Sequence, residues 1–311
     1  MIGKIMEESK QFMDESQLKH LEVILKKYLE PEMDCGDLIQ QFVEAKKLEC
    51  CSSKTIEQYG ERLRFYERMI KKDLRMVTKE DIRTYLSEYQ SRGISSKTLN
   101  NMRLYLSTFY KWLEDEDIIT KSPMRSIKAI KITKVVKKPF TNIEILKIRK
   151  SCNNNYRNVA IVESLLSTGC RISELASLKI SDIHDDEAVI YGKGGKERLV
   201  YFSDEALYAI NNYLNIRNDS SDYLFVSSFQ SKATRLTTNS FRRILKDIGT
   251  RANVENVHPH RFRRTVATNL LNSGMPVQEV ATILGHAKIE TTMIYCNVNQ
   301  SMVKNDHKKY L

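Results

Sequence analysis

The amino-acid sequence predicts a mainly helical protein, in which an all-α domain precedes a larger α+β domain with a small antiparallel sheet. Three observations lead to this fold class. Helical spacing of apolar residues recurs along the first half of the chain, one clear hairpin pattern appears in the second half, and a basic stretch with two prolines divides them. A chain of 311 residues with 41% hydrophobic residues can bury the cores of one or two domains.

Residues 1–33 are predicted to form an N-terminal arm, a single amphipathic helix that ends at Pro31. Residues 34–120 contain four further helical segments, near 37–48, 53–71, 79–91 and 95–117. These segments are separated by SSKT, VTKED and GISSKT, whose serine and threonine residues suit the N-cap position, where a side-chain oxygen accepts a backbone N–H. We therefore expect a compact all-α domain.

The linker, residues 121–140, is strongly basic, and no acidic residue occurs from Ile118 to Ile143. The whole chain has 50 Lys+Arg against 39 Asp+Glu, a net charge of +11, which favours a polyanionic partner such as nucleic acid. A solvated linker is the alternative, but it has no reason to exclude acidic residues, whereas a segment that lies along phosphates does. The residues predicted to bind DNA are Lys121, Arg125, Lys128, Lys131 and Lys134.

Residues 141–311 are expected to form the second domain. Most of this region has helical spacing, but AVIY (188–191) and ERLVYF (197–202) are rich in strand-forming residues, and GKGGK joins them. Glycines in a short connection favour a β-hairpin. Lys193 then projects from the turn, either as a solubilising residue or as a functional one.

The composition indicates a cytoplasmic protein. No apolar run approaches the roughly 20 residues that span a bilayer, and the amino terminus, MIGKIMEESKQFMDES, lacks the apolar stretch of a signal peptide. The 6 cysteines form no CxxC pair and no even framework. Reduced thiols are therefore expected rather than a disulfide scaffold or a structural zinc site.

Two further segments place cations where a plain fold does not need them. In TGCRISEL (168–175), Arg171 stands at the start of a helix, where its charge opposes the helix dipole, and a positioned anion would explain it. In HPHRFRRT (258–265), His260 and Arg263 are three residues apart and share one helix face. Metal binding by histidines is the alternative, but no carboxylate or cysteine stands at ligand spacing, so no metal is predicted.

The segment LGHAKIETTMIYCNV contains His286 and Tyr295, nine residues apart. On one unbroken helix nine steps turn a side chain through about 900°, which places it on the opposite face. Gly285 is predicted to end one helix, and a second helix is expected to restart near Glu290 or Thr291 and to carry the tyrosine. The alternative is a capped helix pair with a buried tyrosine and a surface histidine.

Taken in order, TGCRISEL, GKGGKER, HPHRFRRT and LGHAKIETTMIY resemble the arginine box, the β-turn lysine, the H-x-x-R box and the LGH…Y box of the tyrosine recombinases, the phage-integrase and Xer-like family. The resemblance covers residues 140–300, and the first domain is similar in size and pattern to the family's core-binding domain. It implies a catalytic set of Arg171, Lys193, His260, Arg263, His286 and Tyr295. The chain departs from the family at Phe262 and Arg264, where leucine and a second histidine are common.

The resemblance implies a site-specific recombinase that cleaves and rejoins DNA through a 3′-phosphotyrosyl intermediate. Its partner would be double-stranded DNA at a specific recombination site, bound by a homo-tetramer with possible accessory proteins. Since no paired aspartates accompany the boxes and the covalent bond conserves energy, no magnesium, ATP or other cofactor is expected. A type IB topoisomerase, and a DNA-binding protein that has lost catalysis, are the alternatives.

Overall fold

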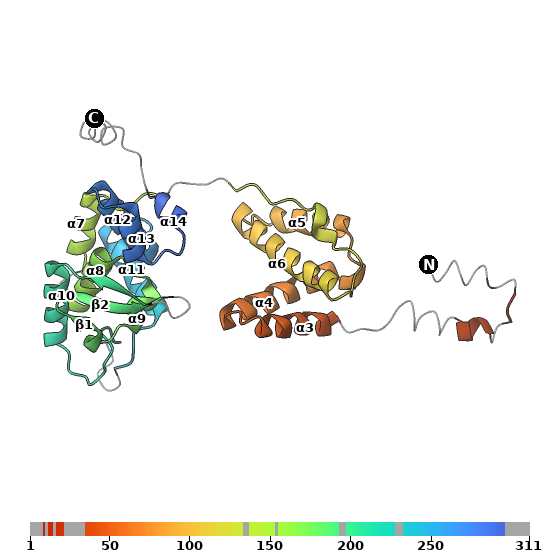
Figure 1. Ribbon diagram of the computed structural model, residues 1–311, viewed down its shortest axis with the longest axis horizontal. Coiled ribbons are helices and arrows are strands. Elements are labelled where there is room, and N and C mark those ends of the chain that lie inside the picture. The colour runs from red at the N-terminus through yellow and green to blue at the C-terminus, as the bar shows by residue number, and fades with distance from the viewer. Residues whose placement is uncertain are drawn as a thin grey trace, which may run out of the picture. The chain divides into compact units, whose positions relative to one another are not determined.

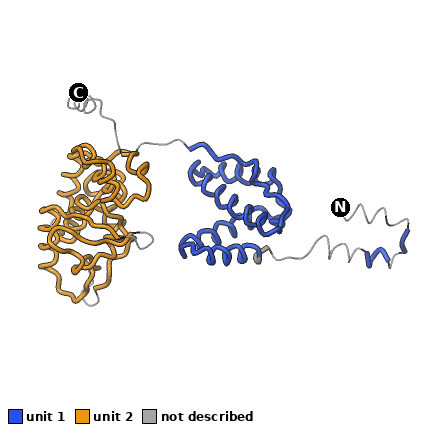
Figure 2. Tube along the Cα trace, viewed as in Figure 1, with its two compact units in different colours: residues 1–135 blue, residues 136–311 orange. Residues whose placement is uncertain are grey.

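The computed structural model describes residues 9, 12–14, 17–21, 35–132, 137–152, 155–192, 197–227 and 233–295. The chain separates into two compact units, residues 1–135 and 136–311 (Figure 2). Each unit has its own buried core. No described helix has the length and apolar character required to cross a membrane.

The first unit is built from helices. Its four long helices are α3 (Cys35–Leu48), α4 (Ser53–Ile70), α5 (Lys79–Ser91) and α6 (Ser96–Asp115), with short 3₁₀ helices η1 (Leu74–Met76) and η2 (Pro123–Ser126) (Figure 1). The four predicted helices are confirmed. Ser52, Thr78 and Ser95 accept backbone N–H groups at the starts of α4, α5 and α6, so the expected caps are confirmed as well.

The core of the first unit is rich in aromatic rings. Phe42 of α3 packs edge-to-face against Phe109 of α6, with ring centroids 5.4 Å apart. The basic segment that follows α6 joins this core, because Met124 is buried, Ile130 N–H donates to Asn100 Oδ1 at 3.1 Å, and Arg103 Nη1 donates to the Ile127 carbonyl at 3.3 Å. The first half of the linker is therefore held along this unit.

The N-terminal arm differs from the single helix predicted for residues 1–33. Gln17 N–H donates to Asp14 Oδ1 at 2.8 Å, and Asp14 N–H donates to Gln17 Oε1 at 3.1 Å. This reciprocal pair starts a new helical stretch at residues 17–21, because a short acidic side chain caps a helix better than it continues one. The prediction of an unbroken helix is wrong at residues 12–14, and most of the arm lies outside the described residues.

The second unit is mainly helical with a small sheet, as predicted. Its helices are α7 (Asn142–Lys150), α8 (Tyr156–Thr168), α9 (Ile172–Ser177), η3 (Ile180–Asp182), α10 (Asp204–Asn215), α11 (Thr238–Ala252), α12 (Pro259–Asn272), α13 (Val277–Leu284) and α14 (Glu290–Met293). Strands β1 (Ile183–His184), β2 (Glu187–Tyr191) and β3 (Glu197–Tyr201) form one antiparallel sheet in that order. The predicted hairpin is β2–β3. Strand β1 was not predicted, because a strand of two residues is too short to show alternation of apolar and polar side chains.

Helix α8 is the central element of the second unit and packs against α10 and α12 (Figure 1). Ala160, Ile161, Val162 and Leu165 on this helix are fully buried. Helix α13 packs against α12, α14 and strand β3. These contacts bring together the end of α8, the start of α12 and the end of α13, which are the segments that carry the predicted site.

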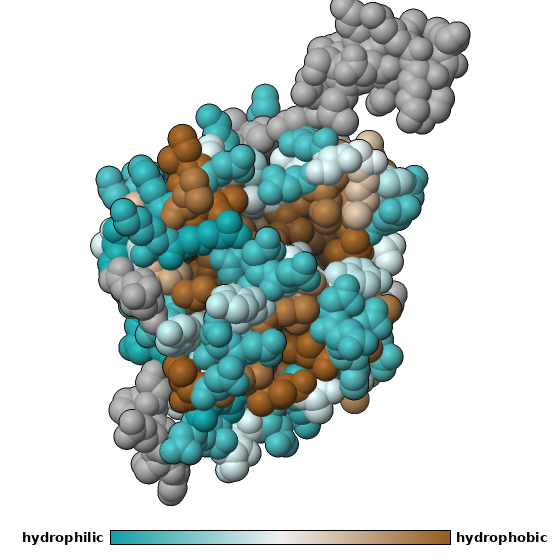
Figure 3. All heavy atoms as spheres, turned by 90° about the vertical axis from the view of Figure 1, so that its left-hand side faces the viewer, coloured by the Kyte–Doolittle hydropathy of each residue, from teal (hydrophilic) through white to brown (hydrophobic). Residues whose placement is uncertain are grey.

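One face of the second unit shows apolar surface between hydrophilic patches (Figure 3). A shallow groove there is lined by residues of α7, α8 and α10, among them Tyr156 and Tyr208. On α7, Ile143 and Leu146 are also largely exposed. None of the predicted site residues lines this groove.

Candidate active site

Arg171 stands between α8 and α9. Gly169 ends α8, and Arg171 occupies the N-cap position of α9, where its backbone N–H donates to Glu174 Oε2 at 2.6 Å. Its guanidinium donates from Nη1 to Glu174 Oε1 at 2.9 Å and from Nη2 to the Gly285 carbonyl at 3.0 Å. The unfavourable position at the helix start is thus offset by Glu174, and Arg171 remains partly exposed.

Arg263 of α12 is almost fully buried, with 4% of its surface exposed. Its guanidinium donates from Nη1 to the Gly169 carbonyl at 2.9 Å and from Nη2 to the Leu284 carbonyl. Burial, together with the charges of Arg171 and Arg198, lowers the pKa of Arg263 to about 10. The group stays a cation at neutral pH, and neither of these partners is a carboxylate.

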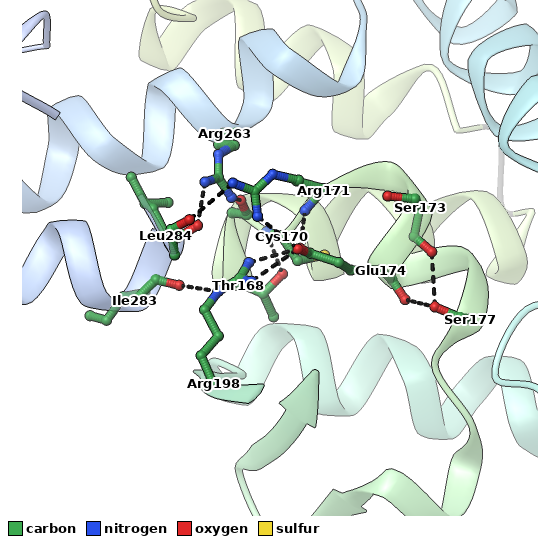
Figure 4. A network of polar contacts seen from close by, with 12 residues as sticks. Thr168, Cys170, Arg171, Ser173, Glu174, Ser177, Arg198, Arg263, Ile283 and Leu284 are labelled. Atoms are coloured by element: carbon green, nitrogen blue, oxygen red, sulfur yellow. Dashed lines mark hydrogen bonds and ion pairs between the residues drawn. The ribbon is translucent and has the colours of Figure 1, made fainter. Parts of the chain in front are cut away.

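Two residues of this network were not predicted as site residues, namely Glu174 and Arg198 (Figure 4). Glu174 is buried, and Arg198 of β3 donates from Nη1 to its Oε1 at 2.9 Å and from Nη2 to its Oε2 at 2.7 Å. Burial raises the pKa of Glu174, but the hydrogen bonds from Arg198 and Arg171 outweigh burial and hold the pKa below its ordinary value. A sequence signal for Arg198 did exist. It stands two and four residues before the buried Val200 and Phe202, a spacing that places side chains on the same face of a strand.

His260 lies in the first turn of α12, one turn before Arg263. Burial lowers its pKa below the ordinary value, and the charges of Arg263 and Arg264 add to this effect. The imidazole is therefore neutral at pH 7 and able to accept a proton. Among the described residues, no group of three or more His, Cys, Asp or Glu side chains is placed to hold a metal ion.

His286 and Tyr295 meet because the helix breaks between them. Gly285 caps α13 in the left-handed conformation with φ of 65°, and α14 restarts at Glu290, as predicted. The two ring centroids are 6.2 Å apart. The second helix ends at Met293, and Tyr295 follows it. The prediction that this helix carries Tyr295 is therefore wrong.

His286 is held in a fixed orientation by a hydrogen bond between its Nδ1 and Thr292 Oγ1 at 2.7 Å. Burial lowers the pKa of His286 to about 4, with further contributions from Arg263, Arg171 and Arg198. The ring is therefore neutral at pH 7, and its second nitrogen is free of this bond. Tyr295 packs against a small buried cluster formed by Ala267 of α12 with Val280 and Leu284 of α13.

The charges at this site are unbalanced. Arg171, Arg198 and Arg263 are three guanidiniums that surround the single carboxylate of Glu174, while the two histidines are neutral. Among the described groups of this network, two positive charges therefore remain close to His286, whose ring centroid lies 6.2 Å from that of Tyr295, in a partly buried setting where uncompensated charge is costly. Each Nη of Arg171 and Arg263 carries two hydrogens, so donors remain for an anion. A phosphate group fits this arrangement.

The two positions that depart from the family pattern contact the end of the linker. Phe262 packs edge-to-face against Phe140 at 4.9 Å, and Arg264 Nη1 donates to the Lys138 carbonyl at 3.1 Å. Nearby, Arg261 lies over the Phe140 ring at 4.2 Å. These side chains of α12 hold residues 138–140 against the second unit.

The other predicted site residues are the lysine of the hairpin turn and the five basic residues of the linker. Lys193 and Lys134 lie outside the described residues. Lys121, Arg125, Lys128 and Lys131 are exposed. Arg125 pairs with Glu114 through a 2.6 Å contact, which leaves it less available for a phosphate than the lysines.

Comparison with known proteins finds matches along both units of the chain. The phage integrase family matches residues 138–302, and the phage integrase N-terminal SAM-like domain matches residues 38–120. The tyrosine recombinase XerC of Leptospira interrogans is 31% identical over 288 residues, covering 88% of this chain and 93% of that protein. The tyrosine recombinase XerA of Pyrococcus furiosus is 31% identical, covering 86% of this chain and 92% of that protein.

Solved structures share the fold. The XerH site-specific recombinase bound to its difH substrate aligns with a TM-score of 0.67 at 20% identity, covering 100% of this chain and 95% of that one. A lambda integrase tetramer bound to a Holliday junction aligns with a TM-score of 0.70 at 18% identity, covering 85% of this chain and 81% of that one.

The fold and the matched families define an enzyme class that cleaves and rejoins DNA. The protein is a tyrosine recombinase, which breaks and rejoins DNA strands through a covalent tyrosine–DNA intermediate. The chain belongs to the phage integrase family.

Proposed function

We propose that Tyr295 is the nucleophile of this recombinase and that Arg171 and Arg263 hold the non-bridging oxygens of the scissile phosphate. The observation that carries this proposal is the excess of two positive charges among Arg171, Arg198, Arg263 and Glu174, close to His286, whose ring lies 6.2 Å from that of Tyr295. Attack on a phosphodiester spreads negative charge over the non-bridging oxygens, and planar guanidiniums bind such oxygens by charge-assisted hydrogen bonds.

The other three residues of the set handle protons and hydrogen bonds. His260, neutral at pH 7, accepts or relays the phenolic proton of Tyr295. His286 donates from the ring nitrogen that does not face Thr292 to a phosphate oxygen. Lys193 protonates the leaving 5′ oxygen as general acid.

The proposed step balances without a metal or ATP. Tyr295 Oη forms a bond to phosphorus while the bond from phosphorus to the 5′ oxygen breaks. The phenolic proton goes to His260, and a proton from Lys193 goes to the 5′ oxygen. The products are a 3′-phosphotyrosyl enzyme and a free 5′-hydroxyl, and the reverse step with a second strand completes the exchange.

The proposed substrate is double-stranded DNA at a specific recombination site, bound by a homo-tetramer, with accessory proteins where the target needs them. It is supported by relatives described as bound to a difH substrate or as a tetramer on a Holliday junction. We also propose that the enzyme acts in the cytoplasm, where its DNA substrate would lie.

We further propose four functional parts along the chain, supported by the matches to residues 38–120 and 138–302. Residues 1–33 are an arm and residues 34–120 a core-binding domain. Residues 121–140 are a linker that lies along the duplex, and residues 141–311 are the catalytic domain.

The test is formation of a covalent adduct on a DNA substrate with a nick just 3′ of the cleavage site, so that the short fragment carrying the new 5′-hydroxyl diffuses away. Tyr295→Phe should bind this DNA as tightly as the unmodified enzyme and form no adduct, because only the attacking oxygen is lost. An adduct that persists in the variant would show that the nucleophile is misassigned. Relaxation of supercoils without exchange between two duplexes would favour a topoisomerase.

A further inference from the structure

Arg198 lies beneath the proposed catalytic residues and is not one of them. It is the second residue of β3, opposite Ile190 of β2, and 9% of its side chain is exposed. Its guanidinium makes three hydrogen bonds, two to the carboxylate of Glu174 and one, from Nε at 2.9 Å, to the carbonyl of Ile283. A long cationic side chain is rarely buried in this way unless its partners require it.

The first connection of Arg198 runs through Glu174 to Arg171. Each carboxylate oxygen of Glu174 accepts one bond from Arg198 and one bond from Arg171. The fork of Arg198 fixes the plane of the carboxylate, because a bidentate pair restricts rotation as well as distance. The position of the Arg171 guanidinium therefore depends on Arg198.

The second connection runs to the end of α13. The last carbonyls of a helix have no partner within the helix and attract cations. Here three successive carbonyls accept bonds from three different arginines: Ile283 from Arg198, Leu284 from Arg263 and Gly285 from Arg171. His286 is the next residue, so the same arginines fix the backbone from which it projects.

We propose that Arg198 is a positioning residue for strand cleavage, which aligns Arg171 through Glu174 and aligns His286 through the carboxyl end of α13. This inference rests on the proposed roles of Arg171, Arg263 and His286. Arg198 does not touch the phosphate. Its hydrogen bonds connect β3 to the arginine box through Glu174 and to the LGH segment through the Ile283 carbonyl.

The test compares Arg198→Lys with the unmodified enzyme in single-turnover cleavage of the nicked substrate. Lysine keeps the charge but loses the fork to Glu174 and the fixed Nε donor to Ile283. We expect cleavage to slow by about 10²-fold, as for a misplacement of about 1 Å in a catalytic group, with DNA affinity unchanged. A variant that folds and cleaves at the full rate would overturn the inference.

Arg217→Lys is the matched control. Arg217 lies in the same unit, forms a buried bidentate pair with Asp219, and also donates to the carbonyls of Tyr223 and Leu224. None of these partners is a candidate site residue. Arg217→Lys should lower the unfolding temperature and leave cleavage unchanged. Equal slowing in both variants would show that Arg198 only stabilises the fold.

Two further measurements separate the connection through Glu174 from an effect on the lysine turn. A substrate with a 5′-bridging sulfur needs no general acid, so it should restore cleavage in Lys193→Ala but not in Arg198→Lys. Rescue of Arg198→Lys would mean that Arg198 acts through the turn, which overturns the inference. Glu174→Gln combined with Arg198→Lys should cost less than the two single losses together, and additive losses would contradict a shared path.

Tyr295→Phe is run beside these variants. If Tyr295→Phe forms no adduct and Arg198→Lys forms it at the full rate, only the inference about Arg198 is overturned, and the proposed function stands. An adduct that persists in Tyr295→Phe overturns the proposed function, and the inference falls with it.

Discussion

Gly285→Ala tests the packing of Arg198 against the end of α13. Gly285 has φ of 65°, a conformation that costs a residue with a side chain about 1–2 kcal/mol. A Cβ at this position would lie 2.9 Å from both Cδ and Nη1 of Arg198, well inside the roughly 3.5 Å of an ordinary contact. The guanidinium has to move, yet it is held between Glu174 and the Ile283 carbonyl.

The size of the effect follows from these two contributions. Loss of one hydrogen bond to a charged group costs about 1.5–3 kcal/mol, so with the backbone part the total destabilisation should be about 2.5–5 kcal/mol. Gly274→Ala is the matched control, because Gly274 also has a positive φ, 93°, but no atom lies within 4 Å of an added Cβ. The control should lose only the backbone part, about 1–2 kcal/mol.

The assay is denaturant unfolding of the two variants, followed by single-turnover cleavage. Gly285→Ala should be less stable than Gly274→Ala by about 1.5–3 kcal/mol, the contribution of the displaced hydrogen bond. It should also cleave more slowly, because Arg198 and the Gly285 carbonyl both shift. Equal stability and equal cleavage in the two variants would refute the packing argument.

Three other predictions concern the proposed site and the linker. Lys193→Ala should slow cleavage of ordinary DNA by about 10²–10⁴-fold with binding little changed, and a slowing that a 5′-bridging sulfur does not relieve would exclude its role as general acid. Because the pKa of His286 is lowered to about 4 in the folded protein, the unfolded chain takes up a proton first, and stability present above pH 6.5 should be lost as pH falls toward 4. In His286→Asn the melting temperature should fall less steeply over this range, and an unchanged pH profile would contradict the assignment. Neutralising three linker lysines, Lys128, Lys131 and Lys134, should weaken binding to all DNA sequences alike. The slope of log K against log salt concentration should fall by about 0.9 for each phosphate that the linker no longer neutralises, whereas an unchanged slope would favour a solvated linker.

The sequence by itself determined the elements whose signals are local. The helices of the first unit begin where Ser52, Thr78 and Ser95 cap them, and each cap acts within three residues. The break that brings His286 to Tyr295 was predicted from Gly285 and the helical apolar spacing of the segment before it, because a left-handed helix end strongly favours glycine. The four boxes were sufficient to identify the family.

The tertiary structure decided how the site residues are held. Arg171 and the Gly285 carbonyl are separated by 114 residues, and Arg198 and the Ile283 carbonyl by 85. No local pattern encodes such a pair, since it depends on α13 packing against β3 and α12. A backbone carbonyl also has no residue identity that a sequence motif could record. The sequence therefore named the groups proposed for catalysis, whereas only the folded chain shows the hydrogen bonds that Glu174 and Arg198 make to Arg171 and to the end of α13.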